Sequence, residues 1–212
     1  MKLSEGQLED GIVVGNTYDK YNSNNPIARK LVAGFSAALS DLVNIVAPAE
    51  IHEVGCGEGY WTTQWKAQGI DARGSDFSSL VIDLARQNAA AMSLDVAFKA
   101  ADIYALDPAV DAAELIVCCE VMEHLDRPTE ALEMLTRLAR PYLVVSVPRE
   151  PIWSAMNLAR GKYWSDWGNT PGHVQRWSKR AFLDLLEQHV DVLEVRSPLP
   201  WTMALCRVRN GD

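Results

Sequence analysis

The sequence lacks any long apolar run. None of its segments approaches the ~20 consecutive apolar residues of a membrane span, and its polar beginning, MKLSEG, has no apolar segment of the kind that a signal peptide requires. Internal repeats, low-complexity segments and linkers are missing as well. We therefore expect a cytoplasmic protein without a membrane span, folded as a single domain over residues 1–212. A chain of this length with 48% apolar residues should bury roughly 70% of its unfolded surface.

Cysteine is scarce, and basic residues are outnumbered by acidic ones. The four cysteines form no C-x-x-C pair, and Cys118 and Cys119 are adjacent in an expected buried strand, so reduced thiols are indicated. Twenty Lys and Arg against 28 Asp and Glu give a net charge of −8. Because binding to a phosphate backbone depends on surplus cations, we expect no nucleic-acid partner.

Three glycines follow a short run that is typical of a β-strand, in the segment Ile51-His52-Glu53-Val54-Gly55-Cys56-Gly57-Glu58-Gly59. Glycine at a strand-to-helix turn adopts positive φ and lets a ligand approach bare backbone. A side chain at any of the three positions would fill that space. The spacing is G-x-G-x-G, whereas a dinucleotide fingerprint is G-x-G-x-x-G, and Tyr60 stands where that third glycine would be. The pattern predicts a nucleoside-cofactor loop, with a plain structural turn as the alternative.

Two aspartates follow at the ends of the next expected strands. Asp76 comes about 17 residues after Gly59, where a carboxylate can accept both ribose hydroxyls. Asp102 ends the third expected strand and suits the exocyclic amine of an adenine. Both positions therefore strengthen the interpretation of the glycine segment as a cofactor loop.

Together these motifs resemble the successive cofactor motifs of class I S-adenosylmethionine-dependent methyltransferases. The match covers about residues 50–148, with weaker similarity toward both termini. The resemblance implies an α/β fold with a Rossmann-like seven-stranded methyltransferase sheet, helices on both faces, and S-adenosylmethionine as cofactor. The positions that it assigns to the cofactor are Glu53, Gly55, Cys56, Gly57, Gly59, Tyr60, Asp76, Phe77, Asp102, Ile103 and Glu120.

Apolar segments and helical patterns alternate along the chain, which implies parallel strands joined by crossover helices. The first helix is expected over residues 25–46, with an apolar stripe of Ile27, Leu31, Phe35, Leu39, Leu42 and Ile45. Further strands are expected near residues 50–55, 70–75, 95–100, 114–119 and 142–147, with helices near 59–68, 78–91 and 127–139. In the tail we expect a helix over 179–189 and two antiparallel strands near 190–196 and 201–208.

Within the single domain, four parts are expected. They are an N-terminal lid and helix (1–47), a cofactor-binding core (48–148), a small helical cap that forms a substrate insertion (149–177), and the last helix with the closing strands (178–212).

A second group of polar residues follows the fourth expected strand, in the motif E-x-x-E-H. Glu120, Glu123 and His124 occupy positions i, i+3 and i+4, so a helical turn would point all three to one face. Two carboxylates and an imidazole on one face repel one another or share a cation. The alternative is a solvated turn in which His124 packs under the cofactor.

His173 lies before the last expected helix, where a further ligand would return to that motif. E-x-x-E-H with such a downstream histidine resembles the ubiquinone-biosynthesis O-methyltransferases and the Hen1-type RNA 2′-O-methyltransferases. The resemblance implies that Glu120, Glu123, His124 and His173 hold a divalent metal beside the methyl-accepting oxygen. Mixed oxygen and nitrogen ligands suit Mg²⁺, Mn²⁺, Fe²⁺ or Zn²⁺. Without a metal, His124 or His173 could act as the catalytic base.

The segment from Pro148 to Trp177 is rich in aromatic residues and is expected to build the pocket of the methyl acceptor. Apolar aromatic walls with few polar groups are typical of small-molecule sites. The alternative is a cap with its own small apolar core. The predicted pocket residues are Trp153, Trp164, Trp167 and Trp177, with Tyr21 from the N-terminal lid.

We therefore predict an enzyme that transfers methyl from S-adenosylmethionine to oxygen of a small molecule, such as a catechol or vicinal diol, with divalent-metal assistance. Three alternatives remain open. They are a metal-free small-molecule O- or N-methyltransferase, an RNA 2′-O-methyltransferase, which the acidic charge balance disfavours, and a non-catalytic cofactor-binding subunit, which the intact cofactor motifs disfavour.

Overall fold

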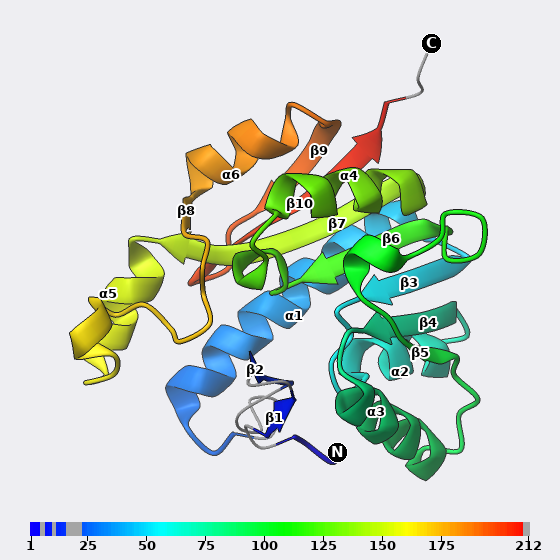
Figure 1. The fold of residues 1–212 in the computed structure, drawn as a ribbon, viewed down its shortest axis with the longest axis horizontal. Coiled ribbons are helices and arrows are strands. Elements are labelled where there is room, and N and C mark those ends of the chain that lie inside the picture. Colours follow the sequence, from blue (N-terminus) through cyan, green and yellow to red (C-terminus); the bar gives the residue numbers. More distant parts are fainter. Residues whose placement is uncertain (5–6, 10–11, 16–22, 210–212) are drawn as a thin grey trace.

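The computed structural model describes residues 1–4, 7–9, 12–15 and 23–209. A central sheet organises the chain, with its strands in the order β5-β4-β3-β6-β7-β10-β9 (Figure 1). The first five of these strands run parallel, and β10 is antiparallel to both β7 and β9. The bounds are β3 Glu50–Val54, β4 Asp71–Asp76, β5 Phe98–Ala100, β6 Ala113–Cys119, β7 Ala139–Glu150, β9 Val190–Arg196 and β10 Trp201–Val208.

This sheet confirms the predicted seven-stranded fold with an antiparallel closing pair. An eighth strand of two residues, β8 (Trp177–Ser178), pairs with the end of β7. β7 was expected to end near residue 147 but continues to Glu150, because Arg149 and Glu150 pair with Trp177 and Ser178. The third expected strand is shorter than predicted and comprises Phe98–Ala100.

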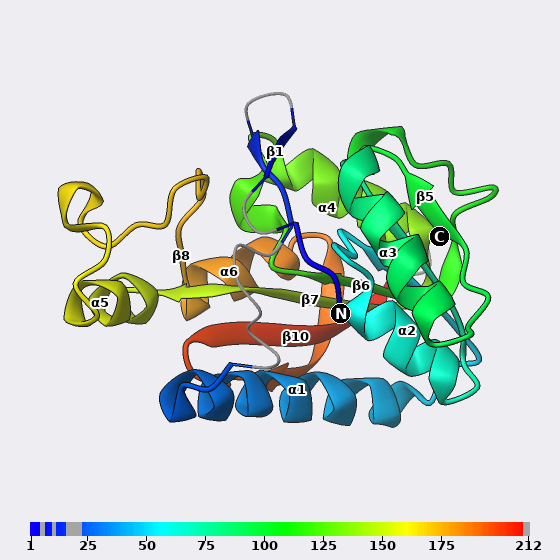
Figure 2. The same ribbon diagram turned by 90° about the horizontal axis from the view of Figure 1, so that it is seen from below.

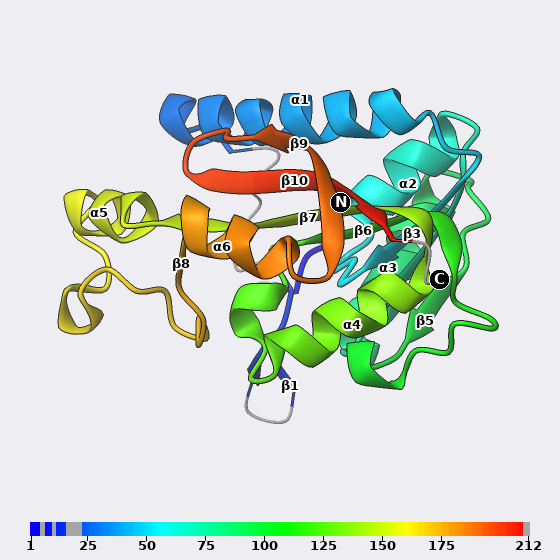
Figure 3. The same cartoon turned by 90° about the horizontal axis from the view of Figure 1, so that it is seen from above.

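Helices cover both faces of the sheet, as predicted. On one face lie α1 (Pro26–Val46) and α2 (Tyr60–Ala67), and on the other α4 (Pro128–Leu138) and α6 (Lys179–Leu186) (Figures 2 and 3). Each face has its own apolar core. Phe35, Leu39, Leu42 and Trp65 pack on the first face, and Leu132, Leu135, Phe182 and Leu186 on the second. The remaining core helix, α3 (Ser79–Ala91), packs against β4 and β5 through residues such as Ile82 and Ala85.

The buried stripe of α1 differs from the predicted one at both ends. The helix begins after Asn25, whose side chain accepts hydrogen bonds from the backbone N–H groups of Ile27 and Ala28. Its buried residues are Phe35, Leu39, Leu42 and Val43. Ile27 and Ile45 are 67% and 51% exposed, so including them in the stripe was wrong. At about 100° per residue, both point roughly 100° away from the centre of the buried stripe.

The segment between β7 and β8 forms the small cap. It contains α5 (Ile152–Ala159) and the short 3₁₀ helix η3 (Trp164–Asp166), and it projects beyond the end of β7 (Figure 1). At the N-terminus, β1 (Leu8–Glu9) and β2 (Ile12–Val13) pair antiparallel. Among the described residues, no helix combines the length and the apolar character needed to cross a bilayer.

Candidate functional site

The glycine loop joins β3 to α2 and has the backbone that its sequence predicts. Gly55, Gly57 and Gly59 have φ angles of 76°, 53° and 78°. Residues with side chains rarely adopt these angles, so glycine is required for the conformation itself. The N–H groups of Gly55 and Cys56 both donate to the carbonyl of Ser75, at 2.7 and 3.0 Å, which ties the loop to β4.

Two of the three glycines also face other parts of the protein. A Cβ atom on Gly59 would lie 2.7 Å from Cζ of Phe98 and 3.1 Å from Cβ of Ala85. A Cβ atom on Gly55 would collide with the side chain of Val121. The expectation that a side chain at these two positions would fill ligand space is therefore corrected: it would fill space taken by α3, β5 and the segment after β6.

Glu53 and Asp76 hold the loop from either side. The buried carboxylate of Glu53 accepts from the backbone N–H of Thr62 at 2.9 Å and from the Thr62 hydroxyl, which fixes the start of α2. Asp76 Oδ2 accepts from the N–H of Gly57 at 3.0 Å, and its Oδ1 accepts from the N–H of Ser78 at 3.1 Å. Burial raises the pKa of the Asp76 carboxyl, although both backbone donors oppose the shift.

The other predicted cofactor residues lie around this loop or at the neighbouring strand ends. Phe77, directly after β4, is 51% exposed. Asp102 caps the 3₁₀ helix η1 (Ile103–Ala105) by accepting from the N–H of Tyr104 at 3.0 Å. Ile103 is buried in the core, the Cys56 thiol is buried, and Tyr60, the first residue of α2, meets the ring of Trp61 edge-on. Glu53, Asp76 and Asp102 thus lie at or beside the carboxyl ends of β3, β4 and β5, where open α/β sheets bind ligands.

Glu120 does not share a helical turn with Glu123 and His124. It follows β6 with φ 60°, and the next helical residues form a short 3₁₀ helix, η2 (Met122–His124). Its carboxylate accepts from the Ser146 hydroxyl at 3.3 Å and from Nε1 of Trp201. The condition under which the E-x-x-E-H motif would present three side chains on one face, a helical turn from Glu120 to His124, is therefore not met, because the left-handed backbone at Glu120 turns that residue toward β7 and β10.

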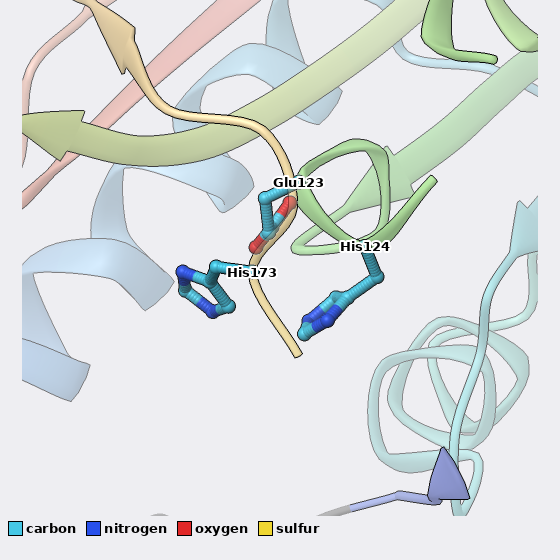
Figure 4. Close-up of side chains that lie close together, drawn as sticks. All are labelled: Glu123, His124 and His173. Atoms are coloured by element: carbon cyan, nitrogen blue, oxygen red, sulfur yellow. The ribbon is translucent and has the colours of Figure 1, made fainter. Parts of the chain in front are cut away.

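Glu123, His124 and His173 come together at the carboxyl end of β6 (Figure 4). One ligand atom from each lies within 4.8 Å of the others. The loop that carries His173 reaches η2 because the N–H groups of Val174 and Gln175 both donate to the carbonyl of Glu123, at 2.9 and 3.0 Å. The structure thus brings together three of the four predicted metal ligands, and Glu120 lies outside the group.

Both imidazoles in this group favour the neutral form. Nδ1 of His124 lies 2.9 Å from the carbonyl oxygen of Gly172, which selects the tautomer protonated at Nδ1 and leaves a lone pair on Nε2. Desolvation lowers the pKa of His124, although the side chain is partly open to solvent. Desolvation, with a smaller contribution from His124, lowers the pKa of His173 to about 4. At neutral pH both rings can therefore accept a proton or bind a cation.

The predicted pocket tryptophans have different surroundings. Trp153, on α5, stacks on His173 with ring centroids 5.7 Å apart. Trp164 and Trp167 are 69% and 80% exposed at the outer part of the cap. Trp177 packs against Phe182 and the core under α6. The predicted contribution of Tyr21 lies outside the described residues.

The sequence interpretation missed Trp201, which holds Glu120 and lies 5.9 Å from Trp153 between ring centroids. It also missed Glu58, whose side chain is 1% exposed and accepts from the backbone N–H and the hydroxyl of Ser4. For Trp201, the signal in the sequence is that an indole N–H in a closing strand needs a hydrogen-bond partner when it is buried. For Glu58, the signal is that a charged residue stands between two glycines of the loop.

Comparison with known proteins identifies the family. A model described as a methyltransferase domain matches residues 27–189. The chain belongs to this family, which confirms the prediction of a class I S-adenosylmethionine-dependent methyltransferase. A search of curated proteins gave no significant match.

Solved structures with the same fold span most of the chain. The magnesium protoporphyrin IX methyltransferase of Synechocystis PCC 6803 with bound SAH superposes with a TM-score of 0.69 at 15% identity, covering 90% of this chain and 91% of that one. The N-methyltransferase NodS of Bradyrhizobium japonicum WM9 with S-adenosyl-L-homocysteine gives 0.65 at 18% identity and coverages of 91% and 92%. The methyltransferase domain of a bacterial Hen1, CtHen1, gives 0.64 at 19% identity and coverages of 84% and 100%. At these identities the likeness concerns the fold.

Proposed function

We propose that this methyltransferase acts on an oxygen of a small molecule, a catechol or vicinal diol, with a divalent cation held by Glu123, His124 and His173. The observation that carries the proposal is the convergence of these three side chains, although His173 lies 49 positions after His124 in the sequence. A long segment that returns to one carboxylate and one imidazole is better explained by a shared ligand than by packing alone.

The three donors fit a divalent cation in charge and chemistry. One carboxylate and two neutral imidazoles are ligands that Mn²⁺, Fe²⁺ and Zn²⁺ accept, and the lowered pKa values of both histidines favour the deprotonated state that a metal requires. Donors that share a cation at about 2.0–2.2 Å are at most about 4.4 Å apart. The donor atoms here lie within 4.8 Å of one another, so small side-chain rotations would complete the site.

On the cofactor side, we assign S-adenosylmethionine to the glycine loop at the carboxyl ends of the parallel strands. Asp76 is assigned to the ribose hydroxyls and Asp102 to the adenine amine, because each carboxylate stands at or just after the carboxyl end of its strand. Asp76 already accepts from Gly57 and Ser78, which holds it in one orientation while leaving further lone pairs available. The N–H of Gly57 and the ribose hydroxyls would then both donate hydrogen bonds to the Asp76 carboxylate. S-adenosylmethionine supplies the activated methyl group when bound.

On the acceptor side, the residues have to orient a hydroxyl and remove its proton. A bound cation would lower the pKa of a coordinated hydroxyl, as it lowers that of water from 15.7 to about 7. The Nε2 lone pair of His124 is available to bind that cation or to accept the proton, because the carbonyl of Gly172 fixes the other nitrogen. Correct placement of the acceptor can contribute about 7–11 kcal/mol to lowering the barrier.

The test combines chelation of the metal with substitutions of the proposed ligand residues. Activity on a panel of catechols should disappear after exhaustive chelation and return with Mn²⁺, Mg²⁺, Fe²⁺ or Zn²⁺. Glu123→Gln and His173→Ala should each lower metal affinity and kcat while leaving the affinity for S-adenosylmethionine within twofold. The matched control is Glu114→Gln, which alters a carboxylate that accepts a hydrogen bond from the backbone N–H of Ala49 at the opposite end of β6. This variant should change neither the metal affinity nor kcat.

A metal-free methyltransferase is the second candidate. The neutral, partly desolvated imidazoles of His124 and His173 favour it, because they can take a proton directly from the acceptor. NodS, an N-methyltransferase with a similar fold, makes nitrogen a reasonable acceptor in this case. Full activity after chelation, with loss of activity in His124→Ala, would favour this candidate over metal assistance.

A further inference from the structure

We infer that Trp153 is a positioning residue that fixes the imidazole of His173 and the turn that carries it. This role rests on the function proposed above and deepens it, because His173 acts in that reaction. The sequence placed Trp153 in the wall of the acceptor pocket; its contacts assign its indole to the support of the site instead.

The indole holds the ring of His173 in one orientation. The two rings are stacked, with centroids 5.7 Å apart and an interplanar angle of 29°. On another side, His173 meets the ring of His124 edge-on, with centroids 4.8 Å apart and an angle of 86°. An imidazole that is stacked on one neighbour and met edge-on by another has little freedom to rotate. The one ring nitrogen that lies within 4.8 Å of the ligand atoms of Glu123 and His124 therefore keeps its position.

The same indole also fixes the backbone next to His173. Nε1 of Trp153 donates to Oγ1 of Thr170 at 2.9 Å. The carbonyl of Thr170 in turn accepts from the N–H of His173 at 3.0 Å. Asn157, a fully buried residue of α5, donates to the same hydroxyl at 3.2 Å. Thr170 thus connects α5 to the turn that presents His173.

Trp153 also contacts a residue anchored in the sheet. Its ring centroid is 5.9 Å from that of Trp201, whose Nε1 donates to Glu120 at the end of β6. Trp201 is the first residue of β10 and pairs with Pro148 of β7. The indole of Trp153 therefore contacts both a sheet-anchored tryptophan and the imidazole, so rigid elements help to determine where the imidazole stands. Such support matters because a displacement of about 1 Å in a reacting group can lower the rate by about 100-fold.

The test compares Trp153→Leu, which removes the ring, with Trp153→Phe, which keeps a ring and removes the N–H donor. Thr170→Val removes the acceptor of that N–H, and Val110→Ala is the control because Val110 lies before β6, outside the cap, and is 70% exposed. The first readout is the ¹H NMR signal of the His173 ring in the intact protein, assigned by its loss in His173→Gln. The second is the steady-state kinetics with a catechol.

Ring stacking should shift the His173 signal upfield in the wild type and in Val110→Ala. The shift should be lost in Trp153→Leu and partly kept in Trp153→Phe. In Trp153→Leu, kcat should fall about 10- to 100-fold, while the KM for S-adenosylmethionine stays within twofold; Trp153→Phe should recover most of the loss, and Thr170→Val should fall between the two.

An unchanged His173 signal in Trp153→Leu would overturn the inference. So would unchanged kcat in both Trp153→Leu and Thr170→Val, or losses of kcat and cofactor affinity in parallel that phenylalanine does not relieve. If the NMR shifts follow the expected pattern but the wild type methylates no catechol, the proposed function fails and the support of His173 by Trp153 stands.

Discussion

The cofactor loop and the acceptor-side group are built in different ways. The loop from Glu53 to Gly59 takes its shape from three glycines with positive φ and from a carboxylate on the adjacent strand, Asp76. The group of Glu123, His124 and His173 depends on a long segment that leaves the sheet at β7, forms the cap and returns at Val174. The first is set by short-range backbone geometry, and the second by the path of the cap.

The largest expected effect tests whether the glycine loop is fixed by packing. In Gly59→Val, a β-branched side chain meets Phe98 and Ala85 at a φ of 78°, and overpacking together with the strained backbone should destabilise the fold by about 3 kcal/mol or more. Gly161→Val is the matched control: its φ is 71°, but no heavy atom of the described residues lies within 4 Å of the added Cβ, so about 1–2 kcal/mol of strain is expected. Urea unfolding measures both, and equal losses would contradict the packing role of Gly59.

The next effect concerns cofactor affinity. Asp76→Ala removes the carboxylate that is assigned to the ribose hydroxyls and should weaken binding of S-adenosylmethionine by about 1.5–3 kcal/mol in calorimetry. Asp71→Ala lies on the same strand, where Asp71 forms an exposed ion pair with Lys66, and should leave the affinity unchanged. Equal affinity in Asp76→Ala and the wild type would remove Asp76 from the cofactor site.

The dependence of stability on pH should have opposite signs in the two regions. Burial lowers the pKa of His173 to about 4, so the unfolded chain takes up this proton first, and stability falls as the pH drops from 6.5 toward 4. Burial raises the pKa of Asp76, so the folded chain protonates first there, and its contribution to stability grows as the pH falls. His173→Gln should reduce the decline between pH 6.5 and 4, whereas Asp76→Asn should not. Identical urea midpoints for His173→Gln and the wild type across this pH range would contradict a lowered pKa of His173 in the folded protein.

The smallest effect separates the outer cap from the site. Trp164→Ser and Trp167→Ser change side chains that are 69% and 80% exposed, and each should alter the free energy of unfolding by no more than about 0.5 kcal/mol. The affinity for S-adenosylmethionine should also stay the same. A loss of several kcal/mol in either variant would mean that the cap depends on these rings.

The same contrast explains how much of the molecule could be predicted from its sequence. The alternation of apolar strands and helical patterns predicted the sheet, and the three glycines with Asp76 predicted the geometry of the loop, because these features depend on backbone preferences and neighbouring residues. Spacing alone could not predict that Glu120 adopts φ 60° and leaves the E-x-x-E-H group. The partners of that carboxylate, Ser146 and Trp201, come from strands that are distant in the sequence.

The aromatic residues of the cap were harder to assign for the same reason. Composition grouped four tryptophans as one pocket, whereas their contacts divide them between His173, solvent and the core under α6. The direction of each side chain depends on how the cap folds back onto β7. That path is set by long-range hydrogen bonds, such as the one from Trp153 to Thr170.

The most direct measurement is anomalous X-ray diffraction from crystals grown with S-adenosylhomocysteine and Mn²⁺. We predict the cofactor product over the glycine loop, together with an anomalous peak about 2.0–2.3 Å from ligand atoms of Glu123, His124 and His173. Density for the cofactor product without an anomalous peak at these three residues, at a saturating concentration of Mn²⁺, would contradict metal assistance.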